Sequence, residues 1–187
     1  MPRPSMAELI DRVRGLVGDP AGADQVFFDD DVQVALERYQ TVVRGAELRP
    51  EPTPLPSPAG ALEYRDYYAA VGDWEADEQL YDAAWRPLTP ASADRLTGHW
   101  TFASPGQQPP VRIVGKVYDV FAAAADLLEQ WAAKVKLEFD FATDGQSFSR
   151  SQKERALLAL AQEYRRRQRP AVAVQARADA DVAAWSW

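Results

Sequence analysis

The stretch "VRIVGKVYDVFAAAADLLEQWAAKV", residues 111–135, changes its hydrophobic period in the middle. Its first part alternates with a period of two, through Val111, Ile113, Gly115 and Val117, which is typical of a strand. From Tyr118 onward the apolar residues follow the period of a helix. The helical stripe consists of Val120, Phe121, Ala124, Leu128, Trp131 and Val135. The stretch therefore predicts a strand followed by a buried helix, which indicates an α+β fold.

Residues 61–117 show strand patterns rather than helical ones. Period-two alternation is strongest in "RLTGHWTFA" (95–103) and in the strand that begins at Val111, and it is weaker in "LEYRDYYAAV" (62–71) and "EQLYDAAW" (78–85). The breaks between these runs are short and rich in Pro and Gly, which suits hairpins better than crossovers. We therefore expect an inserted, small antiparallel sheet of about four strands.

Two helices are predicted before this region. Ser5 and Glu8 have the spacing of a capping box, and Gly18 is expected to end the first helix. A second helix is expected from Asp29 or Asp30 to about Arg44. Residues 49–60 contain five prolines and predict an extended spacer.

A last long helix is predicted before Pro170. Ser149 with Gln152, or Ser151 with Glu154, has the spacing of a capping box at its start. Its expected inner face is Leu157, Leu158, Ala161 and Tyr164. The expected organisation is a mainly helical bundle of about four helices with an inserted sheet and an extended C-terminal tail. Its parts are residues 1–48, 49–60, 61–117, 118–169 and 170–187.

Composition limits the possible functions. The 187 residues carry a net charge of −7 and no cysteine, which excludes disulfides and thiolate metal sites. We expect no secretion signal, no membrane span, no metal and no cofactor. His99 is the single histidine and is expected to be structural. The run Asp29–Asp31 is expected to be a helix N-terminus, where negative charge is favourable.

Three features leave functional alternatives open. The basic cluster "RRRQR" (165–169) is interpreted first as a subunit or partner interface and second as a nucleic-acid-binding module. The segment "DWEADE" (73–78) supplies Asp73 and Glu75 for a third alternative, a carboxylate-based hydrolase. The third feature is the chain end, where Trp185 and Trp187 are either folded back on the domain or docked into another chain.

The C-terminal half resembles the head–tail connector (adaptor) proteins of long-tailed bacteriophages. The resemblance lies in "GKVYDVFAAAADLLEQWA" and "FDFATDGQSFSRSQKERALLALAQEYRRR", and "LIDRVRGLVGD" with "FFDDDVQVALERYQ" is similar to the first two helices of that family. The matching positions are Tyr118, Asp119, Ala122–Ala125, Leu127, Leu128, Glu129, Trp131, Phe139, Asp140, Asp144, Gly145, Ser147, Phe148, Arg150, Ser151 and Gln152. Relative to the chiefly helical adaptors of this family, residues 61–117, the Pro-rich spacer and the tail are additional.

This resemblance implies a structural virion protein without enzymatic activity. Such adaptors form a ring, generally of twelve subunits, that joins the capsid portal to the tail-side neck or head-completion protein and extends the DNA channel. It implies assembly in the host cytoplasm and a place at the virion neck. The C-terminal segment would grip the portal through Val182, Trp185 and Trp187. Interfaces with other subunits or partners would use Arg150, Arg165, Arg166, Arg167 and Arg169.

Overall fold

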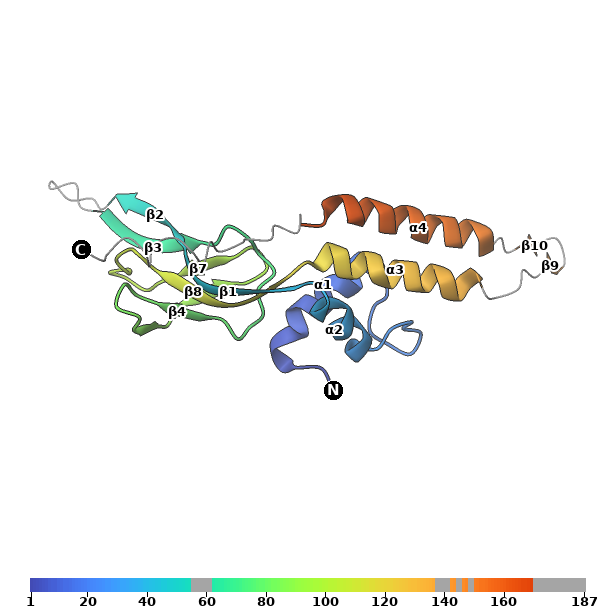
Figure 1. The fold of residues 1–187 in the computed structure, drawn as a ribbon, viewed down its shortest axis with the longest axis horizontal. Helices are drawn as coiled ribbons and strands as arrows, with labels where there is room; N and C mark the ends of the chain where they lie inside the picture. Colours follow the sequence, from blue (N-terminus) through green and yellow to red (C-terminus); the bar gives the residue numbers. More distant parts are fainter. Residues whose placement is uncertain (55–61, 137–141, 144–145, 148–149, 170–187) are drawn as a thin grey trace, which may run out of the picture.

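The computed structural model describes the backbone of residues 1–54, 62–136, 142–143, 146–147 and 150–169. It describes the side chains of residues 1–54, 62–136 and 151–169. The molecule is elongated, with helices at one end and strands at the other (Figure 1). The fold is α+β, with four α-helices and two four-stranded antiparallel sheets. The tail, residues 170–187, lies outside the described residues, and with it the predicted anchor residues Val182, Trp185 and Trp187.

The helices pack around one hydrophobic core. They are a short 3-10 helix at Pro4–Met6, α1 (Ala7–Val17), α2 (Asp29–Glu37), α3 (Val120–Lys136) and α4 (Arg150–Arg167). Each α-helix contributes to this core, for example through Leu9 of α1, Leu36 of α2, Leu128 of α3 and Tyr164 of α4. The predicted α3 is confirmed, and all four alanines of Ala122–Ala125 are buried. In α4 the predicted inner face is wrong for Leu158, which is 38% exposed.

The start of the first helix differs from the prediction. The helix ends at Gly18 with φ 73°, as its glycine indicated. The predicted Ser5–Glu8 capping box is wrong, because Met6 occupies the N-cap position without a side-chain cap. The Ser5 hydroxyl instead donates to the Glu75 carboxylate at 2.7 Å. A long-range partner therefore replaces the local one.

The second helix is shorter than predicted. α2 ends at Glu37, and the expected continuation to Arg44 is wrong because Gln40–Glu47 form strand β1. Arg49–Pro54 are extended, as expected, but they are not a spacer, because they form strand β2 with prolines at every second position. Residues 55–60 of that spacer lie outside the described residues. A proline is tolerated at a sheet edge because an edge strand needs only half of its N–H groups for pairing.

Two sheets share the strand end of the molecule, where one sheet of about four strands was expected. The other long strands are β3 (Leu62–Tyr68) and β8 (Arg112–Tyr118); the short ones are β4 (Gln79–Tyr81), β5 (Pro87–Leu88), β6 (Ser92–Asp94) and β7 (His99–Thr101). One sheet has the order β1-β8-β4-β5 and the other β2-β3-β7-β6. A separate two-stranded ladder joins β9 (Ala142–Thr143) and β10 (Gln146–Ser147).

A second core fills the space between the sheets. Trp74 and Trp100 meet edge to face with ring centroids 5.7 Å apart, and Ile113 and Val117 of β8 pack beside them. The chain passes from β1 to β2 through the buried Leu48, so one continuous segment forms an edge of both sheets. β8 leads directly into α3, which joins the two cores through a single residue, Asp119.

Candidate functional site

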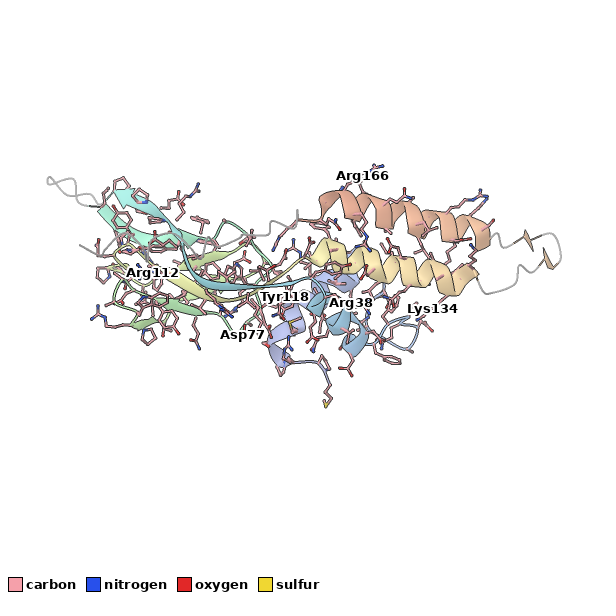
Figure 2. All side chains as sticks on the ribbon, in the orientation of Figure 1. Arg38, Asp77, Arg112, Tyr118, Lys134 and Arg166 are labelled. Atoms are coloured by element: carbon pink, nitrogen blue, oxygen red, sulfur yellow. The ribbon has the colours of Figure 1, made fainter. Side chains whose placement is uncertain are left out.

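A buried carboxylate fastens the helices to the sheets at their junction. Glu75 has 0% exposure. It accepts hydrogen bonds from Arg3 Nε at 2.9 Å and from the Ser5 hydroxyl at 2.7 Å, both in the N-terminal segment. It also accepts from the Tyr118 hydroxyl at 2.6 Å and from Lys116 Nζ at 3.2 Å, both on β8. Figure 2 shows Tyr118 where the strands meet the helices. Segments far apart in the sequence thus converge on one side chain.

The hydrogen bonds keep Glu75 ionised. Burial alone would raise its pKa, but the donors Tyr118, Ser5, Lys116 and Arg3 outweigh burial and lower the pKa to about 2. Burial and the neighbouring carboxylate raise the pKa of Tyr118. Glu75 has 0% exposure and accepts from four side-chain donors of its own chain. This geometry is that of a structural clasp between the helices and the sheets.

Asp73 lies beside this clasp and holds the end of α4. Arg169 Nη2 donates to Asp73 Oδ2 at 2.8 Å and to the Gly72 carbonyl at 2.9 Å. Arg12 Nη1 approaches Asp73 Oδ1 at 2.7 Å as an ion pair that is not aligned as a hydrogen bond. Burial raises the pKa of Asp73 despite these two cations. Asp73 has φ 61°, a left-handed conformation that aspartate tolerates better than most residues.

Arg169 is also fixed through its backbone. Its N–H donates to Asp119 Oδ2, and Asp119 Oδ1 accepts from the backbone N–H groups of Phe121 and Ala122 at the start of α3. The Asp119 N–H in turn donates to the Tyr39 carbonyl at 3.2 Å. The point from which residues 170–187 continue is therefore held against α3, the junction and the residue before β1.

Arg165 ties α4 to the rest of the helical core. Its guanidinium contacts the carboxylates of Asp126 and Glu129 on α3 and donates to the Tyr39 hydroxyl at 3.1 Å. Hydrogen bonds to Glu129 and Tyr39 raise the pKa of Arg165. One member of the predicted basic cluster is thus engaged within its own chain, as Arg169 is.

Arg166 and Arg167 point outward. Their side chains are 77% and 56% exposed, and both pair with Glu163, one turn back on α4. Arg166 Nη1 lies 3.6 Å from Glu163 Oε2, whereas Arg167 Nη2 lies 3.0 Å from Glu163 Oε1. Figure 2 shows Arg166 on the outer side of α4. The side chain of Arg150 lies outside those that the structure describes. Of the predicted interface arginines, only Arg166 and Arg167 are therefore seen on an open surface.

The remaining polar candidates have local structural partners. His99 Nε2 lies 2.9 Å from Asp66 Oδ1, and its ring stacks on Tyr68. The run Asp29–Asp31 forms the first turn of α2, as predicted, and Asp31 accepts from the Phe28 N–H. Among the described residues, no group of histidine, aspartate and glutamate is arranged to hold a metal ion.

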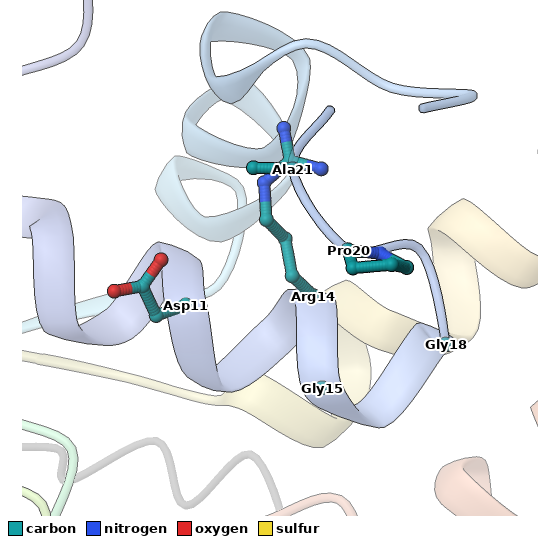
Figure 3. Close-up of a pocket in the computed structure, with 6 residues that line it drawn as sticks. All are labelled: Asp11, Arg14, Gly15, Gly18, Pro20 and Ala21. Atoms are coloured by element: carbon teal, nitrogen blue, oxygen red, sulfur yellow. The ribbon is translucent and has the colours of Figure 1, made fainter. Parts of the chain in front are cut away.

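A shallow pocket of about 330 Å³ lies beside the end of α1. Figure 3 shows its lining, which includes Asp11, Gly15, Pro20 and the buried Arg14. Arg14 donates to Asp29 Oδ1 at 2.6 Å and to the carbonyls of Phe27 and Asp19 at 2.8 and 2.9 Å. The Arg14 guanidinium therefore uses these hydrogen bonds to hold the connection between α1 and α2.

Sequence reasoning missed most of the junction. No common spacing in the sequence marks Arg3, Ser5, Lys116 and Tyr118 as partners of Glu75. None of the helices in the described residues is both long and apolar enough to cross a membrane.

Comparisons of the chain with protein-family models, with curated proteins and with solved structures find no match.

Proposed function

We propose that this chain is a structural adaptor subunit of the neck of a long-tailed bacteriophage. Its four helices act as the bundle that packs against neighbouring subunits in a ring of about twelve, as the resemblance implies. The ring joins the portal to a tail-side neck protein and surrounds a channel through which DNA passes. In this proposal the chain catalyses no reaction and needs no cofactor.

The observation that carries the proposal is the fixation of Arg169. A segment of 18 residues that ends in "WSW" follows directly after it. Three hydrogen bonds, to Asp119, Gly72 and Asp73, set the position and direction of the chain at this point. A rigid root reduces the entropy lost when a tail binds a partner, and repetition around a ring multiplies a weak contact. This arrangement supports a tail that anchors in a portal.

The positions of the resemblance also support the proposal. Asp119 caps α3 and Leu128 lies in the core of the helical end. Ala123, Ala124 and Ala125 belong to the same core, and Ala122 is buried as well. Described residues among the matching positions thus support the packing of α3 against the other helices.

The test is portal binding by full-length variants. Trp185→Ala and Trp187→Ala together should abolish co-sedimentation with the portal of the phage that encodes the chain, because buried indoles dominate such contacts. The matched control is Ser186→Ala, which lies between the two indoles and should leave binding unchanged. Equal binding by both variants would remove the anchor role.

The alternative, a nucleic-acid-binding module using 165–169, has less support. Arg165 and Arg169 are held by carboxylates of α3 and of the junction, which leaves the more exposed Arg166 and Arg167, both beside Glu163, to reach phosphates. Duplex binding that falls steeply with salt, and that Arg166→Ala with Arg167→Ala removes, would favour this alternative.

A further inference from the structure

Strand β1 presents an open hydrogen-bonding edge. It pairs with β8 on one side, and no other strand that the structure describes pairs with its outer side. Most of its residues are exposed, and the Val42 side chain is exposed to 51% although it belongs to a regular strand. An open edge of this length is a template for pairing with a further strand.

The register shows which backbone groups face outward. The Glu75 N–H donates to the Lys116 carbonyl and the Tyr118 N–H donates to the Asp73 carbonyl, both at 3.0 Å. These groups of β8 therefore point away from β1. Their partners in the antiparallel register, Val42 and Gln40, must then direct their own N–H and C=O groups outward.

The edge strand β2 of the other sheet is protected against further pairing by its prolines. β2 carries Pro50, Pro52 and Pro54, which have no N–H to donate. Prolines at an edge are a common protection against further pairing. β1 has none, and its bulge at Gly45 is the only interruption of its register. In contrast to β2, β1 therefore keeps N–H groups at its edge that can pair with a further strand.

A segment of the same chain has the pattern of a missing strand. Residues 174–181, "VQARADAD", alternate strictly between apolar and polar side chains over eight residues. A period of two is typical of a strand with one buried face. Alanine and aspartate have low strand propensity, so this segment needs a preformed edge to pair with.

The root of the tail lies near the start of β1. Asp119 bridges the two, since its carboxylate accepts from the Arg169 N–H and its own N–H donates to the carbonyl of Tyr39, the residue before β1. Residues 170–173 can span about 13 Å when extended. Tethering at this distance gives an effective concentration on the order of millimolar, which favours pairing within one molecule.

We propose that residues 174–181 of each chain add to its own β1 as a parallel fifth strand of that sheet. The outward groups of Gln40 and Val42 form the new ladder, and the sheet order becomes tail-β1-β8-β4-β5. Val182, Trp185 and Trp187 then follow a fixed strand, so they are presented beyond the sheet. This inference does not depend on portal binding, and each can fail without the other.

The first test is residue-resolved amide hydrogen exchange of the full chain by NMR. The Val42 amide should be protected at least about tenfold over its unstructured rate. Ala176→Pro with Ala178→Pro should remove that protection, whereas the matched Ala176→Thr with Ala178→Thr should keep it. The Val43 amide, which is bonded to β8, is the internal reference and should stay protected in every variant.

The reciprocal test changes the edge. Val42→Pro removes only an outward N–H, and we expect it to free the amides of residues 175–180, whereas Val42→Thr should leave them protected. An unprotected Val42 amide in the natural chain, or protection that survives the tail prolines, would overturn the proposal. Protection that falls on dilution would overturn pairing within one chain.

Discussion

Replacing Glu75 by glutamine tests the clasp between helices and sheets. The pKa of this fully buried carboxyl falls from an ordinary value of 4.5 to about 2. Since a tenfold change in proton affinity corresponds to about 1.4 kcal/mol, the ionised Glu75 contributes about 3 kcal/mol to folding near neutral pH. Glutamine keeps the shape but loses the charge opposite Arg3 and Lys116.

The contribution of Glu75 to the free energy of unfolding should decrease as the pH falls. A carboxyl whose folded pKa is lowered stabilises the protein above its unfolded pKa and loses that contribution as pH falls toward the folded pKa. About 2 of the 3 kcal/mol should therefore be lost between about pH 6 and pH 3. In the Glu75→Gln variant this loss should be missing, so its stability difference from the natural chain should shrink by about 2 kcal/mol over that range.

The assay is urea unfolding of both proteins at the two pH values, with the free energy of unfolding extrapolated to water. The matched control is Asp77→Asn, because Asp77 pairs with the same lysine, Lys116, from a more exposed position. It should change stability by less than about 1 kcal/mol. A Glu75→Gln difference that is the same at both pH values would refute the assigned role of the charge.

Two further pairs of variants test local geometry by the same unfolding measurement. Arg165→Ala should cost about 1–3 kcal/mol because it leaves partners on α3 and Tyr39 without their donor, whereas Arg166→Ala should cost less than about 0.5 kcal/mol; equal costs would contradict the description of α4. Gly45→Ala should cost about 1–2 kcal/mol, because Gly45 has φ 76° and an added Cβ would lie 2.7 Å from the Trp85 ring. Gly15→Ala, inside α1 with nothing within 4 Å of an added Cβ, should instead stabilise by up to about 1 kcal/mol, and the reverse order of these two glycine variants would count against the backbone described.

The elements that sequence periodicity predicted well are those whose own residues decide their structure. β8 and α3 have clear periods of two and 3.6, and both are found where expected. The second helix was predicted seven residues too long because Tyr39 and Val43 continue its helical spacing. Pairing with β8, whose residues lie about seventy positions later, decides instead that residues 40–47 form a strand.

The junction could not be predicted for a related reason. Glu75 takes its partners from two segments, one near residue 4 and one near residue 117, and no local pattern links them. The prolines of 49–54 predicted an extended chain correctly but gave no sign of its partner β3. The basic cluster at 165–169 was visible as charge, yet only the fold shows that Arg165 and Arg169 are used internally.

The bond from the Tyr164 hydroxyl to the Leu16 carbonyl joins residues that are 148 positions apart. During synthesis the N-terminal helices leave the ribosome long before α3 and α4 exist to cover them. The apolar faces of Leu9, Val13 and Leu36 stay uncovered until α3 and α4, residues 120–167, have been made. The helical end therefore cannot complete its core while only its first two helices exist, and nascent chains stalled before α3 should be the form that chaperones bind.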